Sequence, residues 1–139
     1  MQPRAFEQIY AVFDRDNHTT YHQALEQAAA LDGRLRNDLD QPVKFSAVPS
    51  VPCFELWLLL HFEQVLARLR RADVYQRLRQ HLDGYDKGQA GHFEGTRALL
   101  DTAIQRATHL ASINNPRDGI TPYTDVHRVV SLLTTLKPE

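Results

Sequence analysis

The sequence predicts a single α/β domain with a small parallel sheet and a helix-rich C-terminal half. Two observations lead to this fold class. Within the first 48 residues, an apolar strand pattern, an alanine-rich helix pattern and a second strand pattern follow one another, which is the order of a βαβ unit with a right-handed crossover. Beyond residue 49, apolar residues recur at helical spacing instead. A length of 139 residues suits one domain.

Composition narrows the classes of protein that the chain can belong to. The net charge of −1 gives no overall attraction to nucleic acid or to an anionic membrane, so such binding needs a local basic patch. One cysteine allows no internal disulfide, which suits a reducing cytoplasm. The N-terminal stretch MQPRAFEQIYAVFDRD is not a signal peptide, and the apolar run LWLLL is too short to cross a bilayer. We therefore expect a cytoplasmic protein with no membrane partner.

The first unit consists of strands at residues 9–14 and 43–48, with a helix between them. IYAVFD and VKFSAV are rich in β-branched and aromatic residues. The helix pattern at 19–33 starts with threonine and stops at Gly33, and a charged connection follows at 34–42. Two parallel strands make a very small sheet, so we expect a partner chain, or a preceding part of a larger domain, to complete it.

The second half predicts four helices, at residues 49–69, 71–84, 93–111 and 121–136. The first is apolar nearly all round in its first half, which predicts a central buried helix with Pro52 in its first turn. A glycine-rich loop precedes the third. In the last, Thr121 suits the N-cap and Pro122 the first helical position.

Two aspartates, Asp14 and Asp16, follow the first strand in the stretch VFDRDNH. Residues two apart in a strand point to the same side, and ligands of α/β folds bind at the carboxyl ends of strands. Carboxylate pairs suit Mg²⁺ or Mn²⁺, which suit phosphoryl chemistry. A turn after the strand explains the same residues without a metal.

Related metal and phosphate motifs fit this stretch poorly. The signature of haloacid-dehalogenase phosphatases matches through Asp16, but His18 stands where that motif has Thr or Val. DRDNHTTYHQAL lacks the central glycine and distal glutamate of a calcium-binding EF-hand loop. His18 and His22 could share a helical face as ligands, but without a third ligand nearby we expect an exposed pair.

The stretch SVPCFELWLLLHF carries a second acidic candidate, Glu55. On the predicted helix Glu55 shares a face with Leu58, Leu59, Phe62 and Leu66. A carboxylate on an apolar face needs compensation, which the helix N-terminus, a metal or a buried cation could supply. We interpret Cys53 as a small core residue and His61 as a core or helix-face histidine.

Four stretches together resemble the RloB family: VFDRDNH, SVPCFELWLLLHF, YDKG and TPYTDVHRVVSLL. RloB proteins are prokaryotic, have a Toprim-like fold and are associated with restriction and phage-defence loci. The second stretch is the most specific, since its order of Pro, Cys, Glu, Trp and His rarely arises by chance. The resemblance covers the chain from about residue 9 onward.

The resemblance implies a Toprim-like Mg²⁺ or Mn²⁺ site for phosphodiester chemistry. Asp14 and Asp16 match the D-x-D pair of that fold, Glu55 is an additional acidic group, and Lys87 in YDKG is a cation for phosphate. The family's earlier strand with a glutamate-glycine motif has no match, because Glu7 precedes Asp14 by too few residues. We therefore expect residues 1–139 to form one Toprim-like domain that is incomplete at its N-terminus.

A local basic patch is predicted around Tyr75, within ARLRRADVYQRLRQH. It contains Arg68, Arg70, Arg71, Arg77 and Arg79. Such a patch could follow a phosphate backbone, with Arg68 and Arg71 as its phosphate contacts. A solvated helix face is the alternative.

These observations favour a metal-dependent nuclease, or a nuclease-like subunit, of a phage-defence system. Asp14 and Asp16 would bind the metal and Glu55 would support or complete the site. The alternative is a non-catalytic interaction subunit that has lost the first acidic strand. The sequence leaves open whether the target is DNA or RNA, whether an ATPase partner is required, and how many chains assemble.

Overall fold

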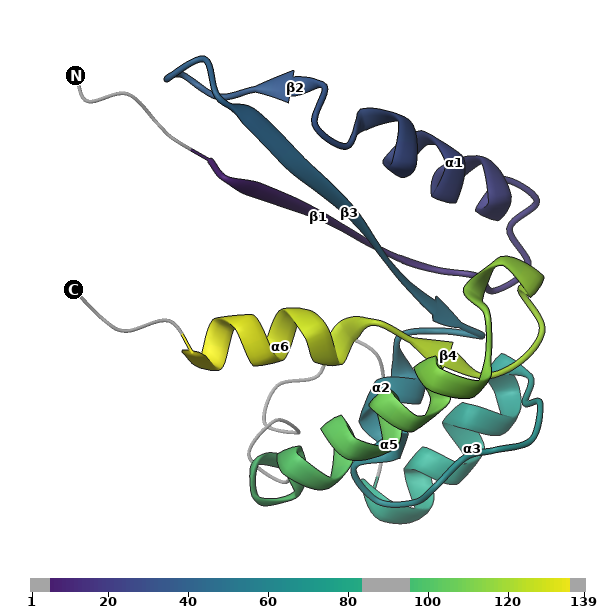
Figure 1. The fold of residues 1–139 in the computed structure, drawn as a ribbon. Helices are drawn as coiled ribbons and strands as arrows, with labels where there is room; N and C mark the ends of the chain where they lie inside the picture. The colour runs from purple at the N-terminus through teal and green to yellow at the C-terminus, as the bar shows by residue number, and fades with distance from the viewer. Residues whose placement is uncertain (1–5, 84–95, 136–139) are drawn as a thin grey trace.

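The computed structural model describes residues 6–83 and 96–135 (Figure 1). Over these residues the chain is α/β, with a small mixed sheet and a helix-rich C-terminal half. The elements are β1 (Gln8–Asp14), α1 (Tyr21–Leu31), β2 (Leu35–Arg36), β3 (Pro42–Val51), α2 (Glu55–Leu60), α3 (Arg71–His81), η1 (Arg97–Leu99), α5 (Leu100–Ile113), η2 (Pro116–Asp118), β4 (Tyr123–Thr124) and α6 (Val126–Thr135).

The predicted βαβ unit is confirmed. β1 and β3 pair in parallel, from Gln8 opposite Lys44 to Asp14 opposite Ser50, and α1 lies between them in the chain. Because the strands are parallel, their carboxyl ends meet at one edge of the sheet. Asp14 and Ser50 therefore lie side by side at this edge.

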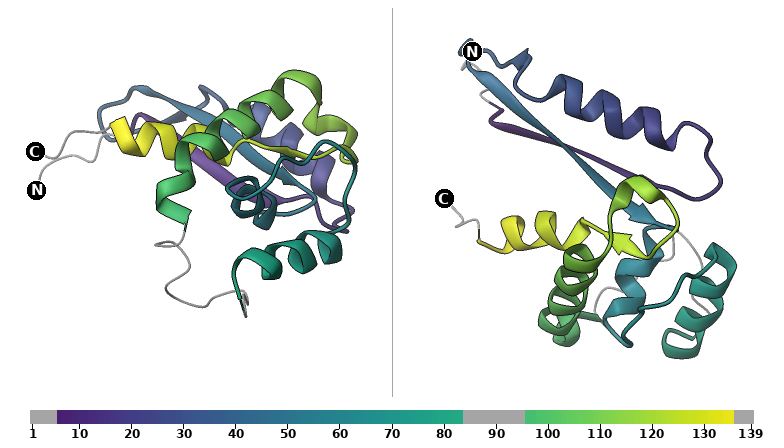
Figure 2. Two further views of the ribbon diagram at one scale, coloured as in Figure 1. Left: turned by 90° about the horizontal axis from the view of Figure 1, so that it is seen from below. Right: turned by 45° about the vertical axis from the view of Figure 1, so that its right-hand side comes forward.

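The sheet separates two apolar clusters, and the two views in Figure 2 show α1 on one side of the strands and the C-terminal helices on the other. On one face, α1 contributes Tyr21, which packs with Val51 and Phe13. The larger cluster, on the other face, gathers Val48 with buried residues of α2, α3, α5 and α6. Side chains alternate between the faces of a strand, which is why Val48 and Val51 belong to different clusters.

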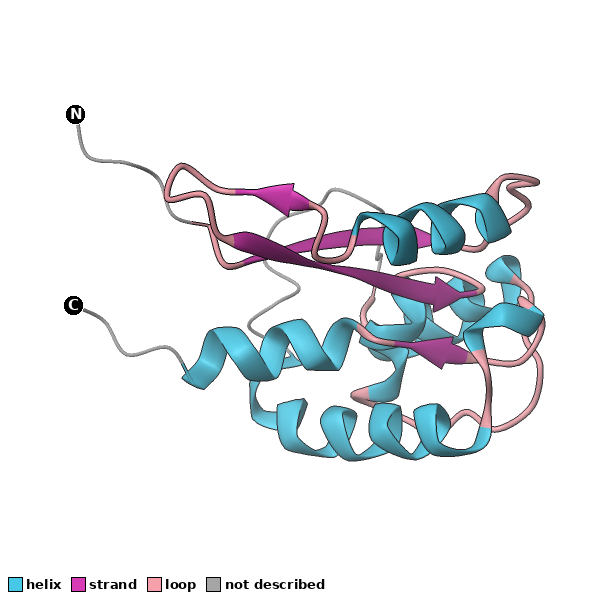
Figure 3. Cartoon of the chain, turned by 45° about the horizontal axis from the view of Figure 1, so that its top comes forward, coloured by secondary structure: helices cyan, strands magenta, loops and turns pink. Residues whose placement is uncertain are grey.

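The prediction of a purely parallel sheet is wrong, because β2 and β4 both pair antiparallel with β3 (Figure 3). A short turn joins β2 to β3, and Asn37 Oδ1 accepts hydrogen bonds within it from the N–H groups of Leu39 and Gln41. So short a connection can join only antiparallel strands. β4 is held by a buried hydrogen bond of 2.8 Å between the hydroxyls of Thr124 and Ser50.

The helix predicted at 49–69 is much shorter in the structure. β3 continues to Val51, and α2 covers only Glu55–Leu60. Prolines at 49 and 52 explain the difference, because the residue before a proline avoids helical backbone. Pro52 therefore precedes the helix instead of lying in its first turn, and Leu66, expected on the buried face, is 53% exposed.

The other helices agree more closely with the sequence. α3 lies within 71–84, and η1 with α5 covers most of 93–111, while the glycine-rich loop at 85–92 falls outside the described residues. The last helix begins at Val126, so Thr121 and Pro122 do not start it. Among the described helices, none has the length and apolar character needed to span a membrane.

Two buried histidines are expected to make the fold less stable in acid. Burial lowers the pKa of both His61 and His127, so their contribution to stability is complete above the unfolded pKa of about 6.5. It is lost as the pH falls through their lower folded pKa values. Urea denaturation at a series of pH values should show this loss. His61→Gln should reduce the pH dependence, and the exposed control His109→Gln should leave it intact; equal slopes in all three proteins would contradict the assignment.

Candidate functional site

Asp14, the last residue of β1, lies where the carboxyl ends of β1 and β3 meet. Its Oδ1 accepts a hydrogen bond from the Phe54 N–H at 3.0 Å. Phe54 directly precedes α2, so this bond ties the end of β1 to the start of α2. Ligands of open α/β sheets bind at this edge, which identifies it as the candidate site.

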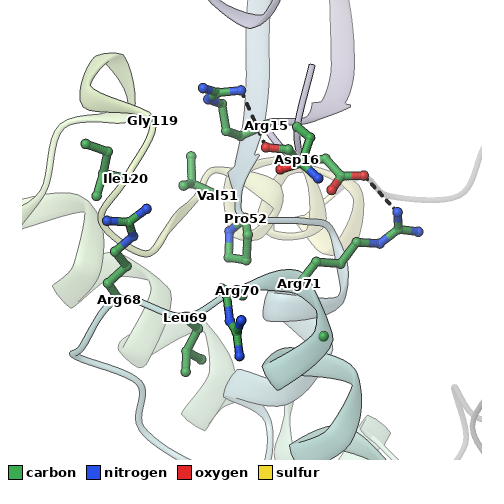
Figure 4. A pocket seen from close by; sticks show the side chains of 12 residues that line it. Arg15, Asp16, Val51, Pro52, Arg68, Leu69, Arg70, Arg71, Gly119 and Ile120 are labelled. Atoms are coloured by element: carbon green, nitrogen blue, oxygen red, sulfur yellow. Dashed lines mark hydrogen bonds and ion pairs between the residues drawn. The ribbon is translucent and has the colours of Figure 1, made fainter. Parts of the chain in front are cut away.

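Asp16 lies in the turn after β1 with a φ of +41°, a left-handed conformation in which aspartate is enriched. Its N–H donates to the Pro52 carbonyl at 2.7 Å, which extends the contact between the strand ends. Its Oδ2 forms an ion pair of 2.8 Å with Nη1 of Arg71 (Figure 4). The Arg71 side chain is 41% exposed, so solvent weakens this pair.

Glu55, the first residue of α2, is fully buried. Its Oε1 accepts a hydrogen bond of 2.9 Å from the Tyr75 hydroxyl, and Arg71 Nη2 donates to that hydroxyl at 3.1 Å. A continuous chain of hydrogen bonds therefore joins Glu55 to Asp16. Burial raises the pKa of Tyr75, so its hydroxyl stays a proton donor. Burying a carboxylate is costly without such a donor.

Cys53 is buried close to the two acidic groups Asp14 and Glu55. Burial raises the pKa of its thiol to about 12, and the charges of Glu55 and Asp14 add to this shift. The charges of both carboxylates therefore reach the Cys53 thiol. The thiol is protonated at neutral pH and is a poor nucleophile, and the interpretation of Cys53 as a core residue is confirmed.

His22 and His61 have hydrogen-bond partners within the fold. His22 is exposed and its Nε2 donates to the Arg117 carbonyl at 2.7 Å. His61 is buried, donates from Nδ1 to the Trp57 carbonyl at 2.9 Å and makes an edge-on ring contact with Trp57. The interpretation of His61 as a core histidine is confirmed.

The acidic residues have the chemistry of a magnesium or manganese site, since such ions favour carboxylate oxygens. In the conformation described, Asp14 Oδ1 and Asp16 Oδ2 are hydrogen-bonded to the protein's own N–H groups. Across residues 6–83 and 96–135, no three histidine, cysteine, aspartate or glutamate side chains are grouped to hold a metal ion. The carboxylates therefore have the chemistry that such an ion prefers, but they are not arranged around one position in the conformation described. Metal binding would require them to rearrange, with Asp16 exchanging Arg71 for the metal.

A pocket of about 390 Å³ opens beside Asp16, at the ends of β1 and β3. We call it the arginine pocket, because four arginines line it: Arg15, Arg68, Arg70 and Arg71. The sequence predicted Arg68 and Arg71 as phosphate contacts, and the structure places both on this pocket (Figure 4). Arg77, from the same predicted patch, forms an ion pair with Glu63 instead.

The sequence patterns did not predict a site role for Tyr75 or Arg15, and the structure does not describe the candidate Lys87. From the sequence, Tyr75 is only the aromatic residue at the centre of the basic patch, but its spacing of four from Arg71 indicates a shared helical face. Arg15 was overlooked although it stands between the two aspartates. Lys87 lies outside the described residues.

Comparisons with known proteins give one match. A family model described as RloB-like protein matches residues 1–133. No curated protein and no solved structure matches the chain.

Proposed function

The chain belongs to the RloB-like protein family, and from that premise we propose that it is a metal-dependent nuclease or nuclease-like subunit with a Toprim-like domain. Its reaction would be phosphodiester hydrolysis within a prokaryotic phage-defence system. One observation carries the proposal: Asp14 and Asp16 lie at the carboxyl end of β1, and Glu55 begins the helix whose preceding residue, Phe54, donates a hydrogen bond to Asp14.

Asp14 and Asp16 would hold Mg²⁺ or Mn²⁺, with Glu55 as a further ligand or support. The metal, when bound, would supply an activated water and Lewis-acid polarisation of the phosphate. In the conformation described, Arg71 pairs with the Asp16 carboxylate, and the Tyr75 hydroxyl is hydrogen-bonded to both Arg71 and Glu55. Arg68 and Arg71, which line the arginine pocket, would bind a substrate phosphate.

The partners expected with this activity are a nucleic acid and another protein chain. β1 is the edge strand of the described sheet, since the strand order is β1-β3-β2 with β4 beside β3. Unpaired edge strands are templates for further pairing. A partner chain, such as an ATPase subunit or a second copy, would extend the sheet there.

The second candidate is a non-catalytic interaction subunit that keeps the fold. It is favoured by the existing partners of the aspartates, since Phe54 and Arg71 already satisfy one oxygen of each carboxylate. A protein that does not bind metal would need such internal donors to stabilise the strand ends.

Titration with Mn²⁺ by calorimetry separates the two candidates. We expect the chain to bind Mn²⁺, and Asp14→Asn and Asp16→Asn each to weaken binding by about tenfold or more. The amide oxygen introduced by Asp14→Asn can still accept the hydrogen bond from Phe54, so the fold should persist. Glu26→Gln, an exposed acidic position on α1, is the matched control and should bind as the parent chain does. Absence of Mn²⁺ binding to the parent chain would reject the catalytic candidate.

A further inference from the structure

The arginine pocket carries more positive charge than its surroundings neutralise. Four arginines and one acidic residue, Asp16, line it, on a chain whose net charge is −1. Arg71 pairs with Asp16 and Arg70 pairs with Asp73, so both of these cations are compensated. Within residues 6–83 and 96–135, neither Arg15 nor Arg68 has an acidic partner. The pocket therefore holds two cations that an anion could pair with.

Arg15 is fixed in place although it has no acidic partner among the described residues. Its Nη1 donates to the His18 carbonyl at 2.8 Å, and its guanidinium lies 5.3 Å from the centre of the Tyr21 ring. Its Nε is buried and has no hydrogen-bond partner in the described part of the chain. A guanidinium held this way is pre-organised, so little conformational entropy is lost when a ligand binds.

Gly119 makes room for Arg15. A Cβ at Gly119 would lie 2.7 Å from Arg15 Nε, closer than such contacts occur, and the φ of Gly119 is +64°. Glycine adopts this conformation without strain. The Arg15 side chain therefore occupies space that only a glycine at position 119 leaves open. A substitution at Gly119 is thus a second way to displace the Arg15 guanidinium.

Apolar side chains form the rest of the lining. Val51, Pro52, Leu69 and Ile120 line the pocket beside the arginines, and Figure 4 shows Val51 between the side chains of Arg15 and Arg68, with Pro52 beside it. Ile120 is 49% exposed, an apolar surface that a ligand could cover. A pocket of about 390 Å³ is within the size range of small-ligand sites.

We propose that the arginine pocket binds a nucleotide, with Arg15 and Arg68 holding its phosphate and the apolar lining contacting its sugar or base. Arginine matches phosphate oxygens through paired N–H groups. The nucleotide is either free or part of a nucleic-acid strand. The inference deepens the proposed function, because it names the ligand that the nuclease would hold beside its acidic residues. Binding itself needs no metal.

The test measures binding in EDTA by calorimetry, with inorganic phosphate, adenosine 5′-monophosphate and a single-stranded octanucleotide as separate probes. We expect the nucleotide to bind more tightly than phosphate, and higher salt to weaken binding. Tighter binding of the octanucleotide would assign the pocket to a strand, and equal binding would assign it to a free nucleotide. Phosphate binding as tightly as both would overturn the proposal of a nucleotide.

Substitutions of the pocket-lining residues test whether the nucleotide binds in the arginine pocket. Arg15→Gln and Arg68→Gln should each weaken nucleotide binding by about tenfold or more, and Gly119→Ala should weaken it through displacement of Arg15. The matched control is Arg34→Gln, at an exposed position between α1 and β2, and it should bind normally. Thermal melts confirm that each variant is folded. Unchanged binding in a folded Arg15→Gln/Arg68→Gln double variant would overturn the inference.

Asp16→Asn separates this inference from the proposed nuclease. It removes the only acidic group among the pocket-lining residues described and releases Arg71, so nucleotide binding in EDTA should be as tight as before or tighter. Metal binding should weaken in the same variant. Loss of nucleotide binding in Asp16→Asn would contradict the inference, whereas loss of metal binding alone would not.

Discussion

Replacing Asp14 and Asp16 together by asparagine is expected to lower Mn²⁺-dependent cleavage of nucleic acid by on the order of 100-fold or more. Substituting even a residue that only supports a metal ligand typically lowers metal affinity or activity by about 10- to 100-fold. The substitution removes both negative charges at the carboxyl edge of β1, while Asp14→Asn keeps an acceptor oxygen for the Phe54 N–H. Single-turnover cleavage of labelled single-stranded DNA and RNA, with and without Mn²⁺, measures the effect.

The control for this loss is Glu26→Gln, which changes the net charge of the chain without touching the site. Its cleavage rate should equal that of the parent chain. A double variant as active as the parent would show that the activity does not depend on these aspartates. Activity of the parent chain that survives in EDTA would show that cleavage does not depend on a metal.

Leu59→Ala is expected to reduce the free energy of unfolding by about 2–5 kcal/mol, the cost of deleting a buried leucine side chain. Leu59 is fully buried in the larger cluster. Leu66→Ala is the matched control, since the sequence placed both leucines on one buried helical face. Leu66 is 53% exposed, so its substitution should change stability by only about 0.5 kcal/mol. Urea denaturation measures both.

An equal loss of stability in the two leucine variants would mean that both positions are buried. It would support the long helix predicted from the sequence over the short α2 of the structure. The pair of variants therefore tests the boundary of α2 directly.

Local patterns predicted the first unit of the fold well. The strand and helix patterns before residue 48 reproduce β1, α1 and β3, because strand propensity, a glycine stop and the parallel crossover are properties of short segments. The end of β3 was missed because apolar residues from 51 to 62 satisfy both strand and helix patterns. The prolines at 49 and 52 decide between these patterns, and Pro52 was interpreted as a residue of the first helical turn.

Pairing between distant segments could not be read from these patterns. Tyr123 and Thr124 form a strand because they pair with Ser50 and Val51, which are far away in the sequence. The local pattern of threonine and proline at 121–122 contains no sign of this pairing and predicted the start of a helix instead. The contact between Asp16 and Arg71 likewise joins separate parts of the fold. The acidic candidates follow from strand-end spacing, from a carboxylate on an apolar helix face and from the resemblance, but the contact of Tyr75 with Glu55 does not follow from any of these.

Asp16 links the two proposals, since it lines the arginine pocket and belongs to the hydrogen-bonded chain that ends at Glu55. In the conformation described, Arg71 neutralises its charge. A metal would compete with Arg71 for the carboxylate, and release of Arg71 would leave it, like Arg15 and Arg68, without an acidic partner among the described residues. Metal binding and nucleotide binding are therefore expected to strengthen each other.

The most direct measurement is a crystal structure of the chain soaked with Mn²⁺, in which anomalous scattering locates the ion. We expect Mn²⁺ within coordination distance of carboxylate oxygens of Asp14 and Asp16, with Glu55 as a ligand or support and Arg71 turned away from Asp16. A structure at saturating Mn²⁺ with no ion at these residues, and with Arg71 still paired with Asp16, would contradict the account.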